Sequence, residues 1–150
     1  EQDLPSRLRA ARWRLSPQRR AVAEVLVGDH VHLTAERIHD LARRRLPEIS
    51  RATVYNTLNE LVAMGQVIEV DVVDGARRYD PNVAERHDHL VCDGCHAIRD
   101  VRRSRKAPAI STEAQAGYLV SSVEITYRGL CPKCARRRSP GRRGTVISGA

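Results

Sequence analysis

Aromatic residues are scarce in this chain of 150 residues, which has no phenylalanine, one tryptophan and four tyrosines. Proteins that hold single-stranded nucleic acid stack its bases on aromatic rings, so this shortage favours a double-stranded partner. Long apolar runs are also missing, since none approaches the roughly 18 residues that a membrane span requires. No signal peptide opens the sequence, and we therefore expect a cytoplasmic protein with no membrane partner.

Positive charge is what the chain has in excess. Lys and Arg number 26 against 18 Asp and Glu, which gives a formal net charge of +8. A basic surface attracts polyanions, and nucleic acid is the first candidate. The alternative is a basic protein whose charge only keeps it in solution. The length fits one ordinary domain, or two small domains that each need a metal or a partner for stability.

Apolar side chains recur at helical spacing in the first part of the chain, and four helices are expected there. The first is a short basic amphipathic helix from Leu4 to Trp13. Each of the next three begins at an N-cap residue whose side-chain oxygen can accept a backbone N–H: Ser16, Thr34 and Ser50. Their ends are marked by a glycine or a proline: Gly28, Pro47 and Gly65. Their inward-facing residues are expected to be Val22, Val25, Leu26, Ile38, Leu41, Leu46, Val54, Leu58 and Leu61.

A β-hairpin is expected after the fourth helix, from Val67 to Val70 and from Arg77 to Tyr79, around a turn that contains Asp74-Gly75. Helices followed by a hairpin predict a winged helix-turn-helix domain over residues 1–81. Most domains with this pattern bind DNA, and a minority are interaction modules.

The pattern changes after Asn82, and residues 82–135 predict a second domain of α/β type, so the chain as a whole is expected to be α+β. Short strands are expected at 90–91 and 98–101, followed by a loop at 102–108, a helix at 110–116 and a longer strand at 118–127. Residues 136–150 are rich in Arg, Gly and Ser, and they are expected to form a basic disordered tail.

Four cysteines form two CxxC pairs, Cys92 with Cys95 and Cys131 with Cys134. Two residues between cysteines let both sulfur atoms reach one ion, and two such pairs complete the tetrahedral four-sulfur shell that suits Zn²⁺. A shell closed by four thiolates has no open position, so this zinc is expected to be structural. The alternatives are two disulfides or a redox couple, which a reducing cytoplasm disfavours.

Histidines and aspartates suggest a second metal site of a different kind. His87 and His89 alternate, so both point to the same side of a strand. Asp80 and Asp100 lie near them in the sequence, and His32 lies at the start of the third helix. Imidazole and carboxylate ligands suit Fe²⁺, Mn²⁺ or Zn²⁺, although a single histidine is more often surface or core filler. The other histidines are expected on the surface: His30, His39 and His96.

The fourth helix opens with polar side chains that are able to contact a DNA groove. The exposed ones are expected to be Arg51, Thr53, Tyr55, Asn56 and Thr57. Arg14, Arg19 and Arg20 could add contacts to the DNA backbone or the minor groove. An ordinary solvated helix face is the alternative interpretation.

These segments, in this order, resemble the ferric uptake regulator family. The resemblance is carried by Arg14 to Arg19 (RLSPQR), Ser50 to Leu58 (SRATVYNTL), His87 to Cys92 (HDHLVC) and the two CxxC pairs, and it covers roughly residues 7 to 135. It implies an N-terminal winged helix, a C-terminal α/β dimerisation domain, and a homodimeric repressor that a metal activates. The implied partner is double-stranded DNA with an AT-rich inverted-repeat operator.

Within that family the sequence is similar to the peroxide-sensing branch and its catalase repressors, in the segments LPEISRATVYNTL and RRYDPN. That branch implies a regulatory Fe²⁺ or Mn²⁺ ion, and oxidation of a ligand histidine by hydrogen peroxide. Iron and zinc regulators often have a further site, but residues 120–124 hold no histidine and Arg86 stands where those regulators often have one. The implied ligands of the regulatory ion are His32, Asp80, His87, His89 and Asp100.

Three other functions fit parts of the sequence. An iron- or zinc-uptake repressor of the same family would differ in its response to metals and peroxide. A thiol-redox switch protein would use the four cysteines as its sensor. A metalloenzyme is disfavoured, because five protein ligands leave little room for a substrate and no nucleophile–base pair stands out.

Overall fold

The computed structural model describes residues 3–28, 31–71, 76–103, 106 and 108–138. The chain divides into two compact units, Glu1–His87 and Asp88–Ala150, each with a sheet of its own. The division falls just after the first residue of strand β4 (His87–Cys92). Among the described residues, no helix is long and apolar enough to cross a membrane.

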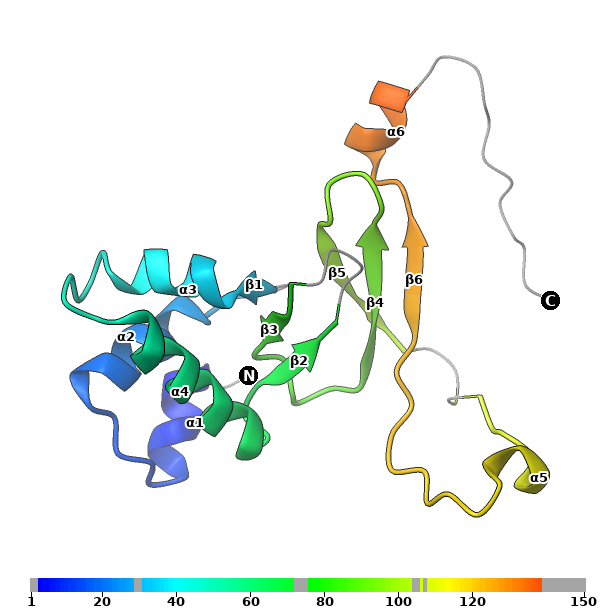
Figure 1. Ribbon diagram of the computed structural model, residues 1–150, viewed down its shortest axis with the longest axis horizontal. Coiled ribbons are helices and arrows are strands. Elements are labelled where there is room, and N and C mark those ends of the chain that lie inside the picture. Colours follow the sequence, from blue (N-terminus) through cyan, green and yellow to red (C-terminus); the bar gives the residue numbers. More distant parts are fainter. Residues whose placement is uncertain (1–2, 29–30, 72–75, 104–105, 107, 139–150) are drawn as a thin grey trace. The chain divides into compact units, whose positions relative to one another are not determined.

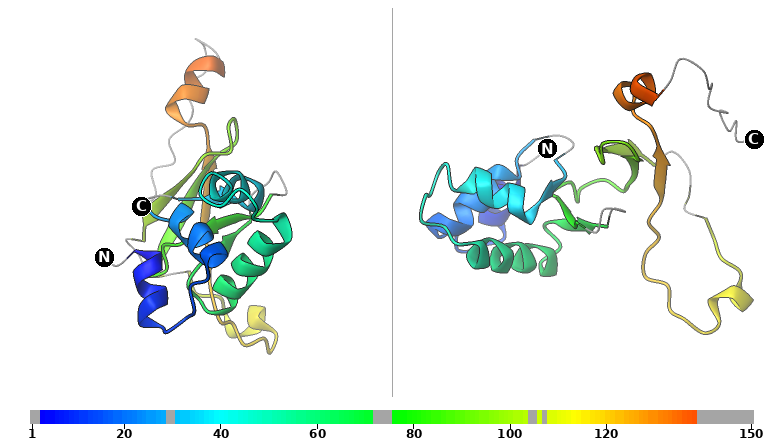
Figure 2. Two further views of the ribbon diagram at one scale, coloured as in Figure 1. Left: turned by 90° about the vertical axis from the view of Figure 1, so that its left-hand side faces the viewer. Right: turned by 45° about the horizontal axis from the view of Figure 1, so that its top comes forward.

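The first unit combines a cluster of helices with a small antiparallel sheet (Figures 1 and 2). Its helices are α1 (Leu4–Ala10), α2 (Pro17–Val25), α3 (Ala35–Ala42) and α4 (Arg51–Ala63). Its strands, in sheet order, are β1 (Leu33–Thr34), β3 (Arg78–Asp80) and β2 (Ile68–Val70). Tyr79 at the centre pairs with Leu33 on one side and Glu69 on the other. The expected hairpin is therefore confirmed, while its turn at Asp74-Gly75 lies outside the described residues.

The N-caps of three helices are those that the sequence predicts. The side chains of Ser16, Thr34 and Ser50 each accept the backbone N–H three residues further on, at 3.3, 3.1 and 3.1 Å. These bonds satisfy N–H groups that have no partner within the helix, which fixes where each helix begins. The end of α4 is equally specific, because Gly65 takes the left-handed φ of 65° that a Schellman turn requires.

Apolar residues of all four helices meet in one core in the first unit. Leu8, Val22, Ile38, Val54 and Leu58 are fully buried there, and Tyr79 of the central strand packs against the same cluster. Each buried aliphatic side chain contributes on the order of 1.5–3 kcal/mol relative to an exposed one. The helices are thus held by a shared core that local capping alone could not replace.

The second unit is built on a three-stranded sheet of order β5–β4–β6, with β5 at Ile98–Arg102 and β6 at Thr126–Gly129. Strand β6 runs parallel to β4, from His89 opposite Thr126 to Cys92 opposite Gly129. Between β5 and β6 the chain makes a long excursion that carries α5 (Thr112–Gln115), and α6 (Pro132–Arg138) follows β6 (Figure 1). Among its described residues, the buried apolar ones are Val91, Cys92 and Ile98.

Several expected boundaries were wrong. Helix α1 ends at Ala10 instead of Trp13, because Arg12 takes a φ of 55° that no right-handed helix allows. Helix α3 ends at Ala42, short of Leu46. The strand expected at 118–127 is reduced to β6, which begins where the chain meets β4. Residues 136–138 were expected to open a disordered tail but belong to α6, and residues 139–150 lie outside the described residues.

Candidate functional site

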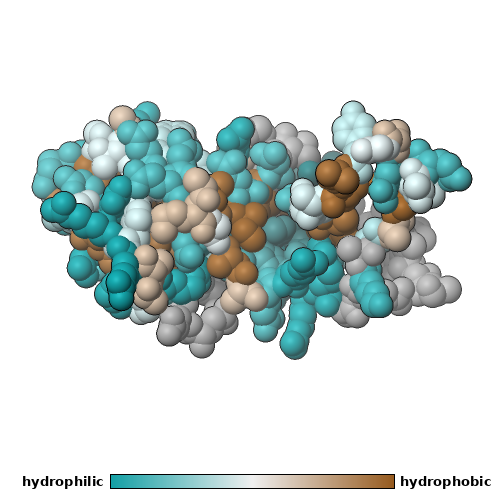
Figure 3. All heavy atoms as spheres, turned by 90° about the horizontal axis from the view of Figure 1, so that it is seen from below, coloured by the Kyte–Doolittle hydropathy of each residue, from teal (hydrophilic) through white to brown (hydrophobic). Residues whose placement is uncertain are grey.

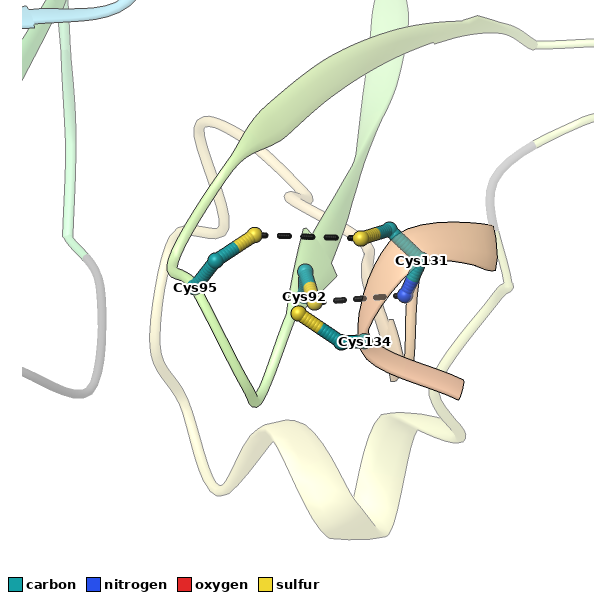
Figure 4. A group of neighbouring side chains, drawn as sticks. All are labelled: Cys92, Cys95, Cys131 and Cys134. Atoms are coloured by element: carbon teal, nitrogen blue, oxygen red, sulfur yellow. Dashed lines mark hydrogen bonds between the residues drawn. The ribbon is translucent and has the colours of Figure 1, made fainter. Parts of the chain in front are cut away.

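Four cysteine sulfur atoms converge at one end of the second unit (Figure 4). Cys92 ends β4 and Cys95 lies in the turn that follows, while Cys131 and Cys134 come from the start of α6. All four Sγ atoms lie within 4.8 Å of one another, and those of Cys95 and Cys131 are 3.8 Å apart. The two CxxC pairs, although 36 residues apart in the chain, therefore form one cluster.

Backbone N–H groups polarise these thiols unequally. The Cys131 N–H donates to Cys92 Sγ at 3.2 Å and the Gly94 N–H at 3.4 Å. The bond from Cys131 is the largest cause that lowers the pKa of Cys92 to about 6. In contrast, the hydrogen bond between Cys134 and Cys131 raises the pKa of Cys134 to about 12. Cys92 and Cys134 therefore do not lose their protons together near neutral pH unless a cation offsets the charge.

The donor set fits zinc. Zn–S bonds of about 2.3 Å in a tetrahedron place neighbouring sulfur atoms about 3.8 Å apart, which is the separation of Cys95 and Cys131. The four cysteines are free, and a disulfide would need its sulfur atoms near 2.05 Å. Cys92, Cys95, Cys131 and Cys134 thus form a cluster that suits Zn²⁺ better than disulfides.

A glycine makes the cysteine cluster possible. A β-carbon at Gly94 would lie 2.9 Å from Cys134 Cβ, 3.0 Å from its Sγ and 3.3 Å from Leu130 Cδ2. Real β-carbons are not found at such distances, so any side chain here would push α6 away from the first CxxC turn. Sequence reasoning missed this role, although a glycine between two metal-binding cysteines is a usable signal.

A second cluster lies in the first unit and centres on Asp80, the last residue of β3. One carboxylate oxygen, Oδ2, is 2.8 Å from His87 Nε2 and 3.5 Å from His32 Nε2. The other, Oδ1, accepts the Asn82 N–H at 2.7 Å. The Asp80 side chain is fully buried, and the two imidazoles are 5% exposed or less. The structure thus brings together three of the predicted metal ligands.

The orientation of His87 indicates why a cation suits this cluster. Its Nδ1 lies 2.9 Å from the Glu85 carbonyl oxygen, which can only accept a hydrogen bond. If Nδ1 carries the proton, Nε2 of a neutral ring turns its lone pair towards the Asp80 carboxylate. Such an arrangement requires a second proton or a metal ion next to Nε2. A carbonyl that orients the far nitrogen is typical of metal-binding histidines.

The other two predicted ligands lie on neighbouring strands of the second unit, His89 on β4 and Asp100 on β5. A His89 ring nitrogen and an Asp100 carboxylate oxygen lie within 4.8 Å of each other. The Cys92 N–H donates to the Ala97 carbonyl, and continuing this antiparallel pairing sets His89 opposite Asp100. This nitrogen–oxygen pair has the same chemistry as the cluster around Asp80.

The first two turns of α4 present the polar face that was expected. Arg51, Tyr55 and Asn56 are exposed and Thr53 is half-buried. Tyr55 donates to Glu36 Oε1 at 2.6 Å, and this bond lowers the pKa of Glu36 while raising that of Tyr55. Thr57 was wrongly assigned to this face, since it is buried and donates to the Thr53 carbonyl. Glu36 was missed, because only the fold brings α3 beside α4.

Three arginines in or just before α2 were predicted to contact DNA. Arg14 and Arg20 are exposed. Arg19 is instead engaged within the unit: it forms an ion pair with Glu60, donates to the Arg14 carbonyl and stacks 4.2 Å above the Trp13 ring. These contacts make Arg19 a link between α2 and α4.

The remaining histidines were only partly predicted. His39 is buried rather than exposed, and its Nε2 lies 3.1 Å from the Ile49 carbonyl. His96 is half-buried, and His30 lies outside the described residues.

Comparisons with known proteins agree with this geometry. The model described as "Ferric uptake regulator family" matches residues 10–128. The transcriptional regulator FurA of Mycobacterium tuberculosis is 36% identical over 134 residues, 89% of this chain and 90% of that protein. The peroxide-responsive repressor PerR of Staphylococcus epidermidis is 32% identical over 132 residues, 85% of each chain. The solved structure of the Campylobacter jejuni peroxide stress regulator aligns with a TM-score of 0.61 at 28% identity, covering 89% of this chain and all of that one.

Proposed function

Because this chain belongs to the ferric uptake regulator family, we propose that it is a metal-dependent repressor that senses hydrogen peroxide and controls peroxide-defence genes such as catalase. Membership makes it a metal-dependent transcriptional regulator, and regulators of this family bind DNA and act as dimers. Relatives named for iron and for peroxide are similar to it at comparable identity. The peroxide role therefore depends on the residues of the site.

The observation that carries the proposal is the buried Asp80 carboxylate with two imidazoles at one oxygen. His87 and His89 alternate on β4 and so project from the same face of that strand. This supports a single five-ligand site whose members are His32, Asp80, His87, His89 and Asp100. Three nitrogen and two oxygen donors suit Fe²⁺ or Mn²⁺, whereas the cysteine cluster suits Zn²⁺.

Fe²⁺ at these residues supplies the one-electron chemistry that activates peroxide, and Mn²⁺ does not. The group that reacts is a ligand imidazole, of His32 or His87. One oxygen atom of peroxide would be inserted at a ring carbon, whose hydrogen moves to the new oxygen or to a ring nitrogen, and the second peroxide oxygen would leave as water with both peroxide hydrogens. The imidazole loses two electrons and peroxide gains them. An oxidised ring is a poor ligand, so the ion is lost and the repressor leaves its operator.

The DNA contacts are assigned to Arg14, Arg51, Thr53, Tyr55 and Asn56, with Arg19 in support. A homodimer that presents two such faces fits an AT-rich inverted repeat in cytoplasmic DNA. To convert the repressor almost completely to its DNA-binding state, the metal must bind that state more tightly than the other by about 5 kcal/mol of binding free energy.

An electrophoretic mobility shift on a palindromic AT-rich duplex tests the proposal. The zinc-containing protein is loaded anaerobically with Fe²⁺ or Mn²⁺, and each sample is measured with and without peroxide. We expect both ions to support binding, and peroxide to abolish it for Fe²⁺ alone. Asp80→Asn should lose the response to both ions, while Asp40→Asn, which changes an exposed aspartate of the same unit, should retain it.

Other results would favour the alternatives. A Fe²⁺ complex that survives peroxide would indicate an iron- or zinc-uptake repressor. A response to peroxide that is equally strong with Mn²⁺ would point to the cysteines as the sensor.

A further inference from the structure

Arg7 of α1 binds two segments that are far from it in the sequence, the end of α4 and the residue after Asp80. Its Nη2 donates to the Gln66 carbonyl at 2.9 Å and to the Pro81 carbonyl at 2.8 Å, and its Nε donates to Gln66 Oε1 at 3.2 Å. The side chain is part-buried, and its neighbours Leu4 and Leu8 anchor α1 in the core. A planar guanidinium with five donors can serve several acceptors at once, which an ammonium group does less well.

The first of these segments is the end of α4. The Gln66 N–H bonds to the Leu61 carbonyl and the Gly65 N–H to the Val62 carbonyl, so Gln66 completes the Schellman turn that closes the helix. Arg7 holds this turn through both the main chain and the side chain of Gln66. A shift of Gln66 therefore shifts α4, the helix that carries the proposed DNA-contact residues.

The second segment adjoins the metal cluster. Pro81 follows Asp80 directly and is itself buried. Its ring fixes φ and its carbonyl oxygen also accepts the Val83 N–H at 3.1 Å, so the Pro81 carbonyl has little freedom to move independently of Asp80. A shift of the Asp80 carboxylate therefore also shifts the Pro81 carbonyl, to which Arg7 donates. All of these residues lie within the first unit.

We propose that Arg7 couples metal binding at the His32–Asp80–His87 cluster to the position of α4 and α1, and so to DNA affinity. Arg7 is a positioning residue, since it acts on the cluster through the Pro81 carbonyl and on α4 through Gln66. The proposal rests on the function proposed above only in requiring that metal raise DNA affinity; it does not depend on peroxide. Allosteric coupling is reciprocal, so DNA must raise metal affinity by the same factor.

The test measures that factor with Mn²⁺ and no peroxide. Operator affinity is determined with and without Mn²⁺, and Mn²⁺ affinity with and without operator, for the full chain. Arg7→Gln removes the charge, Arg7→Lys keeps it but loses the planar fork, and Gln66→Ala deletes one of the three acceptors. Arg9→Gln is the matched control, because Arg9 lies on the same helix and donates only to Ser6 Oγ among the described contacts. Thermal unfolding of each variant without metal reports its folding.

We expect both Arg7 variants to lower the coupling factor by about tenfold, in both directions of the cycle, with a smaller loss for Gln66→Ala. Mn²⁺ affinity without DNA should stay near that of the wild type. If Arg7 only stabilises the fold, the variants will melt earlier but keep the wild-type factor, which would overturn the proposal. A wild-type protein whose operator binding ignores Mn²⁺ would refute the metal-dependent function itself, and this inference with it.

Discussion

A methyl group added at Gly94 would prevent the first CxxC turn from packing against α6. The absent side chain leaves room for Cys134, whose Cβ would be 2.9 Å from an added β-carbon. Asp80 shows the same dependence on single atoms in the other cluster, because its two oxygens have different partners. At the residue scale, both candidate metal centres are thus defined by close packing around the ligands as well as by the ligands.

Gly94→Ala should therefore weaken zinc binding. Overpacking of this kind costs about 1–3 kcal/mol, which corresponds to a loss of zinc affinity of roughly 5- to 150-fold. The measurement is a competition with a chromophoric chelator. Gly129→Ala is the control, since a β-carbon there meets nothing within 4 Å. Equal zinc affinity in the two variants would show that α6 moves aside without cost.

At the scale of elements, capping decides where the helices begin. The Ser50 hydroxyl caps α4 by accepting the Thr53 N–H. It also forms a hydrogen bond with Thr53 Oγ1 at 2.9 Å, which holds the capping side chain in place. The N-terminus that it fixes is where the expected DNA contacts begin. A weaker cap would therefore fray the part of the helix that matters most for binding.

Ser50→Ala is expected to destabilise the first unit by about 1 kcal/mol. For a unit of this size, the midpoint of thermal unfolding should fall by roughly 4–8 °C. Ser111→Ala provides a comparison, because Ser111 caps only the four-residue α5, none of whose residues is buried. A melting point that moves equally little in both variants would argue against the cap.

The elements that the sequence predicted are those fixed by local chemistry. The caps at Ser16, Thr34 and Ser50 and the hairpin around β2 and β3 follow from short patterns, and they were correct. The long strand at 118–127 failed because alternation cannot show where a strand finds a partner. Helix α6 was missed because it begins inside a CxxC pair, and the two-residue β1 because Leu33 becomes a strand only beside Tyr79.

The candidate sites divide in the same way. The four cysteines were predictable because ligand spacing along the chain is itself the signal. The partners that orient the histidine cluster were not, since Glu85 contributes a carbonyl and Asn82 a backbone N–H, which any residue possesses.

At the scale of the whole molecule, the two units differ in what stabilises their folds. The first has a core drawn from four helices, whereas the described part of the second buries only three apolar residues: Val91, Cys92 and Ile98. The second unit also exposes large apolar residues, among them Tyr118 at 78% and Leu119 at 99%. Figure 3 shows hydrophobic residues at the surface on one face of the molecule. A unit of this kind needs zinc and a partner subunit, which agrees with the dimers of this family.

Removing the zinc should accordingly unfold the second unit and spare the first. Hydrogen exchange measured peptide by peptide, before and after chelation, should show lost protection over residues 88–103 and 108–138. Peptides from α1 to α4 should keep theirs, because none of their core residues depends on the cysteine cluster. Simultaneous loss of protection in both units would mean that the zinc supports the whole chain.

In the proposed mechanism peroxide modifies a histidine of the Asp80 cluster and no cysteine. Peptide mass spectrometry of the zinc-containing protein, loaded with Fe²⁺ and treated with peroxide, tests this assignment. We predict one added oxygen on the peptide that contains His32 or the peptide that contains His87, with all four cysteines still able to bind zinc. Oxygen or a disulfide found at Cys92, Cys95, Cys131 or Cys134, with both histidines unchanged, would refute the proposed sensing by histidine.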